Sequence, residues 1–178
     1  MIPARFEFAR ARSVQDALKA LSAKHTKVIC GGQSLIPLLR FRLAEPARLV
    51  DITGVAALKG IGTFKGGVRI GAATTYRELL ASKTLRTGFP LLAQVTERIG
   101  DRQVRNLGTI GGGLAHADPA ADMPAVMLAL DASLVLQSGR GKRSVPARAF
   151  FKGPFATALK PQELLVEIRL PLPPKGAG

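Results

Sequence analysis

Two glycine-rich segments constrain the fold of this chain more than any other feature of its sequence. Residues 108–124 read GTIGGGLAHADPAADMP, with four glycines in the first six positions and a predicted helix start at Asp118 and Pro119. Residues 30–35 read CGGQSL, where two glycines and a hydroxyl follow an apolar run and precede a helix-like segment. Glycine lets backbone amides converge on an anion and lets a flat ligand approach closely. We therefore expect one long phosphate-bearing ligand held from two sides, although two tight turns without a ligand would give the same pattern.

The chain carries a large excess of positive charge, with 26 Lys and Arg against 12 Asp and Glu and a formal net charge of +14 over 178 residues. These basic residues are spread along the sequence, and no helix-turn-helix, zinc-finger or RNA-binding signature accompanies them. One tyrosine and no tryptophan are a poor supply for stacking on single-stranded nucleic acid. We expect no nucleic-acid partner, and attribute the charge to solubility, an anionic ligand or an acidic protein partner. A basic nucleic-acid-binding domain stays open as an alternative.

Several common kinds of active site have no counterpart in the sequence. It contains no GxxxxGK[ST] phosphate loop, no GxGxxG between a strand and a helix, and no GxSxG motif around Ser34. His116, Asp118 and Asp122 are close in sequence, but one imidazole with two unevenly spaced acids is a poor metal site. We predict no catalytic side chain and no metal ligand.

The number of cysteines and the length of the apolar runs indicate in which cellular compartment the protein is found. The single cysteine, Cys30, permits no internal disulfide and no iron–sulfur cluster held by this chain alone. The first residues, MIPARFEFARARS, lack the apolar segment of a secretory signal, and the apolar runs are too short to span a bilayer. We expect a cytoplasmic protein without a membrane span.

The periodicity of apolar residues divides the chain into two predicted α/β lobes and a tail. The first lobe, residues 1–53, alternates short strands with helices, the first helix beginning in a capping box formed by Ser13 and Asp16. Its elements are a strand at residues 6–8, a helix at 13–24, a strand at 26–30, a helix from 34 and a strand at 48–52.

The second predicted lobe, residues 54–171, begins and ends with strands and carries its helices between them. Thr75 and Glu78 form a second capping box, and Pro119 suits the first position of a helix. Its elements are strands at residues 58–64 and 68–72, helices from 75, at 89–99 and at 119–130, and strands at 132–137, 142–145 and 164–170. Residues 172–178 are rich in proline and small residues, typical of a linker.

Six segments together resemble one known family: GGQSL, IPLLRFRLAEP, VDIT, IGAATTYREL, RNLGTIGGG and HADPAADMPA. They resemble, in order from Ile2 to about Pro173, the FAD-binding medium subunit of molybdenum hydroxylases of the carbon monoxide dehydrogenase and xanthine dehydrogenase type. The resemblance implies an α/β (α+β) fold: a two-lobed FAD-binding domain of the PCMH (vanillyl-alcohol oxidase-like) type, with flavin between the lobes. It also implies a molybdenum-cofactor large subunit and an iron–sulfur small subunit as partners. FAD would pass electrons from the iron–sulfur clusters to an external acceptor.

The resemblance also implies the residues that would hold FAD. They fall in both glycine segments and in the acidic segment that follows: Cys30, Gly31, Gly32, Gln33, Ser34, Leu35, Thr109, Ile110, Gly111, Gly112, Gly113, Asp118 and Asp122. Gly31, Gly32, Gln33 and Ser34 would face the diphosphate. The Thr109 hydroxyl and the Gly111 and Gly112 amides would take the remaining phosphate and ribityl oxygens, and Asp122 would reach the ribityl chain or flavin edge.

Two departures from the family pattern bear on this expectation. Relatives often carry asparagine at the position of Gly113 and histidine at that of Gln33, so one hydrogen bond to FAD is expected to be missing or replaced by water. Relatives also continue for about a hundred residues, the size of a further small domain, which would include an aromatic side chain over the flavin. A truncated homologue acting as a binding or assembly module, with weak or no flavin, is therefore the alternative function.

A basic segment at residues 98–105 precedes the second glycine segment. Arg98, Arg102 and Arg105 recur at helical spacing, so on one helix they would share a face. We expect this face either to dock an acidic partner surface or to be ordinary solvated surface.

Overall fold

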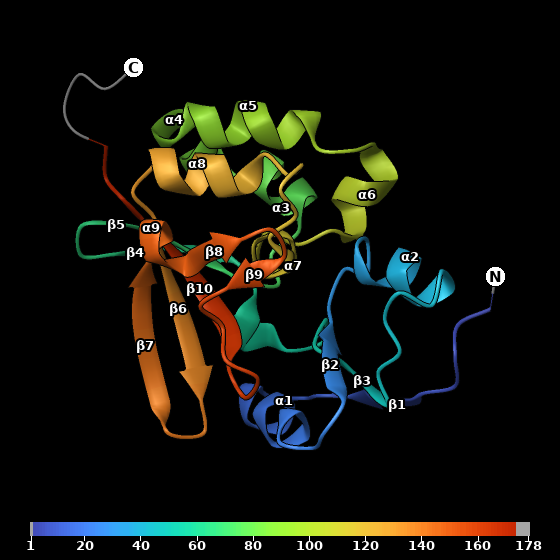
Figure 1. Cartoon of the computed structure of the whole chain (residues 1–178). Helices are drawn as coiled ribbons and strands as arrows, with labels where there is room; N and C mark the ends of the chain where they lie inside the picture. The colour runs from blue at the N-terminus through green and yellow to red at the C-terminus, as the bar shows by residue number, and fades with distance from the viewer. Residues whose placement is uncertain (1, 174–178) are drawn as a thin grey trace.

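The computed structural model describes residues 2–173, which form two larger sheets, a small two-stranded sheet and a layer of helices (Figure 1). The smaller sheet is parallel and has three strands in the order β1-β3-β2. These strands are β1 (Glu7–Arg10), β2 (Thr26–Ile29) and β3 (Arg48–Asp51). Parallel neighbours need crossover connections, which here are the helices α1 (Val14–Leu21) and α2 (Leu35–Arg40). The first glycine segment therefore lies between the end of β2 and the start of α2.

The helix α1 confirms a predicted start and corrects a predicted end. Ser13 caps it by accepting a hydrogen bond from the Asp16 amide at 3.0 Å. The Asp16 carboxylate accepts from the amide of Arg12 rather than Ser13, so the expected capping box is offset by one residue. The helix ends at Leu21, three residues before the expected end, because a turn is needed before β2.

The larger sheet is antiparallel and has five strands in the order β4-β5-β10-β6-β7. Its strands are β4 (Ile61–Phe64), β5 (Gly67–Gly71), β6 (Ser133–Ser138), β7 (Gly141–Pro146) and β10 (Leu164–Pro171). β4 and β5 form one hairpin and β6 and β7 another, both as predicted, and β10 joins them in the middle. β4 begins at Ile61 rather than residue 58 because the short 3-10 helix η1 (Ala56–Leu58) precedes it.

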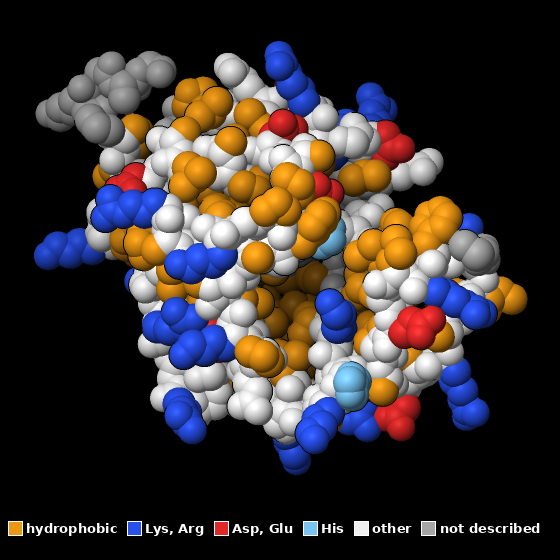
Figure 2. Space-filling view, viewed as in Figure 1, with side chains coloured by type: hydrophobic (Ala, Val, Ile, Leu, Met, Phe, Trp, Pro, Cys, Tyr) orange, Lys and Arg blue, Asp and Glu red, His pale blue; other side chains and the backbone are white. Residues whose placement is uncertain are grey.

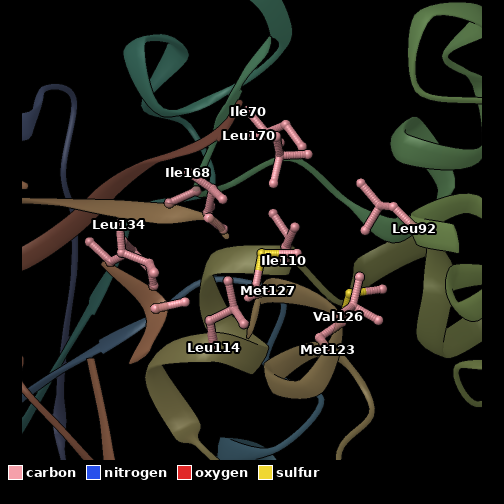
Figure 3. Close-up of a cluster of buried hydrophobic side chains, with 14 of the residues drawn as sticks. Ile70, Leu92, Ile110, Leu114, Met123, Val126, Met127, Leu134, Ile168 and Leu170 are labelled. Carbon is pink, nitrogen blue, oxygen red and sulfur yellow. The ribbon is translucent and has the colours of Figure 1, made fainter. Parts of the chain in front are cut away.

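Helices cover one face of the larger sheet. In chain order they are α3 (Tyr76–Ala81), α4 (Lys83–Gly88), α5 (Pro90–Arg98), α6 (Arg102–Leu107), α7 (Ile110–His116), α8 (Met123–Ala129) and α9 (Ala147–Phe150), followed by the small hairpin β8 (Phe151–Gly153) and β9 (Ala156–Thr157). α7 contacts both β10 and α8, so it lies between the sheet and the outer helices. Figure 3 shows Ile110 and Leu114 of α7 in one buried cluster with Ile168 of β10 and with Met123 and Met127 of α8.

The opposite face of the larger sheet packs against the smaller sheet. A second buried cluster joins Val14 of α1 and Val50 of β3 to Val135 of β6 and Val166 of β10. Successive side chains of β6 point to opposite faces of the larger sheet. Leu134 and Leu136 therefore belong to the buried cluster under the helices, and Val135 belongs to the cluster that faces the smaller sheet. The smaller sheet is therefore fixed to the larger one by apolar packing.

The helix predicted to start at Asp118 and Pro119 begins later. Ala117 has a left-handed backbone (φ 52°) that ends α7, and the Asp118 carboxylate accepts a hydrogen bond from the Ala120 amide at 2.9 Å. This local turn uses residues 118–121, so α8 starts at Met123. Leu172 donates its amide to the Gly66 carbonyl, and most of the predicted tail, residues 174–178, lies outside the described residues.

Candidate functional site

The first glycine segment forms a row of open backbone amides. Within residues 2–173, the amides of Gly32, Gln33, Ser34 and Leu35 donate no hydrogen bond to the protein. Gly32 has a left-handed backbone (φ +72°), a conformation that favours glycine, and α2 begins at Leu35, the last residue of the row. Successive amides in such a turn form a concave anion-binding site. The amides are therefore free to bind a phosphate, and the predicted phosphate cradle stays a prediction.

Two polar side chains of this segment behave differently. The exposed Ser34 hydroxyl makes no cap hydrogen bond to α2, so it can reach a ligand. The side-chain amide nitrogen of Gln33, Nε2, donates a hydrogen bond to the Gly31 carbonyl at 3.0 Å and therefore holds the turn together. The side chain keeps a second N–H, so our expectation that Gln33 faces the diphosphate stays a prediction.

The second glycine segment is the first turn of a helix rather than an open loop. Thr109 caps α7, accepting a hydrogen bond from the Gly112 amide at 3.2 Å. The Gly111 amide donates to the Ala72 carbonyl at 2.9 Å, and the Gly113 amide donates to the Thr109 carbonyl at 3.1 Å. The expected donation from the Gly111 and Gly112 amides to a ligand is therefore corrected, since both are occupied within the protein.

Glycine is needed at residue 111 because the backbone packs tightly there. A Cβ on Gly111 would lie 2.5 Å from the Cβ and from the carbonyl oxygen of Ala72. Ile110, beside it, is fully buried and donates its amide to the Thr74 carbonyl at 3.1 Å. These contacts position the start of α7 against the end of β5.

The two glycine segments meet in space. A Cβ on Gly31 would overlap the carbonyl oxygen of Leu107 and lie 2.8 Å from the Cα of Gly108. The Cys30 thiol interacts with the Thr109 hydroxyl; burial raises the pKa of Cys30, and this hydrogen bond lowers it by a smaller amount. A ligand over the open amides of residues 32–35 thus also lies close to the start of α7.

A cavity of about 200 Å³ adjoins the start of α7. It is lined by residues of α3, α5, α7 and α8 and of the turns that follow α5 and precede α8: Tyr76, Arg98, Ile99, Gly100, Gly113, Ala120, Ala121, Asp122 and Met123. The Asp122 carboxylate is exposed and makes no hydrogen bond to the described protein, whereas that of Asp118 is engaged by Ala120. Asp122 therefore has both carboxylate oxygens open to a ligand, and Asp118 still has its Oδ2 open, so both acids stay predicted ligand contacts.

Tyr76 was not among the predicted site residues. Its ring is buried in the helical layer, and its hydroxyl lies where a Cβ on Gly113 would be. Burial raises the pKa of Tyr76 to about 12. The sequence offered one signal, that this is the only tyrosine of the chain, but no pattern linked residue 76 to residue 113.

The three arginines of the basic segment do not share a helix face, which corrects our expectation. Arg98 ends α5, and the turn at Gly100 (φ 48°) separates it from Arg102 at the start of α6. Arg105 donates to the carbonyls of Ile99 and Gly100 at 2.8 and 2.9 Å. Its guanidinium therefore fixes one wall of the cavity instead of extending into solvent.

A recess lies between two parts of the molecule. Figure 2 shows the surface hollowed between the larger part of the molecule and the part that carries α2, with hydrophobic side chains on the floor of the recess. The open amides of residues 32–35 suit a diphosphate, and the cavity beside Gly113 offers neutral and polar groups to the remainder of a long ligand. The residues present fit FAD.

The described chain offers neither a metal centre nor a membrane-spanning helix. Within residues 2–173, no group of three or more His, Cys, Asp or Glu is placed to hold a metal ion. His116 instead packs against Phe155, with ring centroids 5.2 Å apart. The helices of the same residues include none with the length and apolar character needed to cross a bilayer.

Residues 4–173 match the family described as the FAD binding domain in molybdopterin dehydrogenase, and the chain belongs to that family. The chain is therefore an FAD-binding domain, as predicted, and FAD is its cofactor.

Individual relatives agree. The glyceraldehyde dehydrogenase medium chain of Sulfolobus acidocaldarius is 45% identical over 97% of this chain and 62% of its own length. The carbon monoxide dehydrogenase medium chain of Hydrogenophaga pseudoflava is 42% identical over 100% of this chain and 63% of its own. A solved structure of carbon monoxide dehydrogenase from that organism superposes with a TM-score of 0.96 at 42% identity, covering 99% of this chain and 62% of that one. The predicted family and mixed α/β fold class are confirmed, and the chain spans less than two thirds of the length of these relatives.

Proposed function

We propose that this chain is the FAD-binding part of a molybdenum hydroxylase complex, in which it holds the flavin between an iron–sulfur donor and an external acceptor. The observation that carries the proposal is the row of four unpaired amides at residues 32–35, beside the start of α7, in a chain of the FAD-binding family. Relatives named as medium chains of glyceraldehyde and carbon monoxide dehydrogenases support an assembly with further subunits.

The proposed division of labour follows from the groups available. FAD supplies the redox chemistry when bound, accepting electrons and passing them on. The chain's own residues bind and orient it: the amides and the Ser34 hydroxyl at the diphosphate, and the cavity beside Gly113 at another part of the ligand. No side chain needs to act as an acid, base or nucleophile.

The partners and the compartment belong to the same proposal. We propose an iron–sulfur small subunit and a molybdenum-cofactor large subunit as partners, because several relatives are named as medium chains or FAD-binding subunits. The half-buried free thiol of Cys30 suits a reducing compartment, and we propose the cytoplasm.

Ligand titration of the purified chain tests the proposal. Calorimetry with FAD, FMN and ADP should show FAD binding most tightly, because only FAD spans the amide row and the cavity. Ser34→Ala should weaken FAD and ADP by about 1–3 kcal/mol, the usual loss for a hydrogen bond to a charged group. Ser144→Ala, which removes an exposed hydroxyl from the edge strand β7, is the matched control and should change nothing. FMN binding as tightly as FAD, or no flavin binding at all, would contradict the proposal.

A further inference from the structure

The hydroxyl of Tyr76 is a polar group without a protein partner at the edge of the cavity. The residue is only 7% exposed, so the ring is fixed in the helical layer. Tyr76 nevertheless lines the cavity, and within residues 2–173 its hydroxyl makes no hydrogen bond; its oxygen opens into the cavity and is not one of the enclosed side-chain atoms without a partner. A phenol donor that opens into the cavity and has no protein partner can meet a ligand or water there.

Gly113 is what gives this hydroxyl its place. A Cβ on residue 113 would overlap the Tyr76 hydroxyl oxygen, whereas the next atom of that ring, Cζ, is 3.7 Å away. The Gly113 amide already donates a hydrogen bond to the Thr109 carbonyl. At this point of the cavity, therefore, the free donor is the phenol and not the glycine backbone.

The charges around the cavity indicate which part of a ligand it suits. One carboxylate, Asp122, and one guanidinium, Arg98, line it, so it offers no excess positive charge to a diphosphate. The open amides of residues 32–35 provide that attraction elsewhere. The space beside Tyr76 instead suits neutral polar atoms, such as hydroxyls and ring carbonyls.

We propose that the Tyr76 hydroxyl donates a hydrogen bond to the ribityl–flavin half of bound FAD, in the space that Gly113 leaves open. This inference rests on the proposed function and adds a binding residue to it. Because burial raises the pKa of Tyr76 to about 12, the phenol stays protonated and able to donate throughout the physiological range.

Tyr76→Phe removes the donor and keeps the buried ring. The dissociation constant for FAD should rise about 3–10-fold, the value of one ordinary hydrogen bond, while that for ADP should stay unchanged. Because the chain has one tyrosine and no tryptophan, the tyrosine emission of the wild-type protein comes from Tyr76 alone. FAD should quench this emission, and ADP should leave it unaltered.

A double-mutant cycle tests the pairing with Gly113. Gly113→Ala in the wild-type chain should displace the hydroxyl, lowering FAD affinity and the Tm of the apo-protein. In the Tyr76→Phe background the same substitution should cost much less, because the overlapping oxygen is gone. Gly139→Ala, where a new Cβ meets no atom within 4 Å, is the matched control.

The outcomes separate the inference from the function on which it rests. Absence of FAD binding by the wild-type chain would overturn the proposed function. Wild-type FAD affinity in Tyr76→Phe, with the wild-type chain binding normally, would overturn only the role of Tyr76. Equal losses of FAD and ADP affinity together with a lower Tm would also overturn it, because they would mark the hydroxyl as structural.

Discussion

Gly31 and Leu107 touch through their backbones, so that a side chain on residue 31 would overlap the Leu107 carbonyl. Gly31 precedes the open amides of the first glycine segment, and Leu107 ends α6 just before the cap of α7. Because both contacting groups belong to the main chain, neither can move aside by changing a rotamer. This single contact sets how close the two glycine segments approach each other.

Gly31→Ala should therefore destabilise the fold by about 1–3 kcal/mol and weaken FAD binding, since overpacking forces the backbone to shift. Thermal unfolding and FAD titration measure the two effects. Gly54→Ala is the matched control, because a Cβ there meets no atom within 4 Å. A Gly31→Ala protein with unchanged Tm and FAD affinity would show that the two segments are not in fixed contact.

The ionisation of Tyr76 should be visible in the stability of the apo-protein at high pH. Burial raises its pKa to about 12 from an ordinary value of 10. Between these values the folded chain holds a proton that the unfolded chain has lost. The stabilisation is thus fully present below pH 10 and is lost as pH rises to about 12, by roughly 2–3 kcal/mol. Denaturant melts at several pH values between 10 and 12 measure the free energy of unfolding. This free energy should fall with pH in the wild-type protein and not in Tyr76→Phe. An equal fall in both proteins would show that Tyr76 is not its cause.

Arg143 and Glu163 connect β7 to the loop before β10, and the pair should contribute measurably to stability. The hydrogen bond from Arg143 is the largest cause that holds the pKa of Glu163 below its ordinary value of 4.5. Glu163→Gln should cost about 1–2 kcal/mol at neutral pH. The cost should disappear as pH falls below 4.5 through the lowered pKa, because the wild-type carboxylate is then protonated too.

Urea melts at several pH values measure how the stability difference between the wild-type protein and Glu163→Gln changes with pH. Glu7→Gln is the control, since its pair with Arg48 is exposed and such pairs contribute little. Equal, pH-independent effects of the two substitutions would remove the Arg143 contact as the cause.

Arg105 should matter to FAD rather than to partner docking. Its guanidinium donates to the Ile99 and Gly100 carbonyls, which line the cavity. Arg105→Ala should loosen this wall and raise the FAD dissociation constant about 3–10-fold, the value of one or two hydrogen bonds. Arg102→Ala, at an exposed residue of the same helix, should not. If instead only association with a partner subunit responds to Arg105→Ala, the docking hypothesis is restored.

Features fixed by neighbours in sequence could be predicted from the sequence. The capping box of Thr75 and Glu78 is present as expected, because its bonds span three residues. The hairpins and β10 follow from alternating apolar residues and turn residues. The row of amides after β2 was foreseen because two glycines and a hydroxyl between a strand and a helix are typical of an anion-binding turn.

Features set by distant contacts could not be predicted. Three successive glycines argue against a helix by propensity, yet α7 contains them because Ile110 and Leu114 are fully buried. The Gly111 amide bonds to Ala72, 39 positions earlier in the chain, so no local pattern could reveal that it was occupied. The meeting of Tyr76 and Gly113 escaped prediction for the same reason.

The central place of β10 in the larger sheet has a consequence for biosynthesis. Strands β5 and β6 are not neighbours, and β10, residues 164–171, is the strand between them. On the ribosome, the two hairpins therefore remain separate until β10 has been made, and the cluster shared by Val135 and Val166 stays open as well. The nascent chain must protect two unpaired strand edges through the synthesis of all the intervening residues, which is when such edges are most exposed to aggregation.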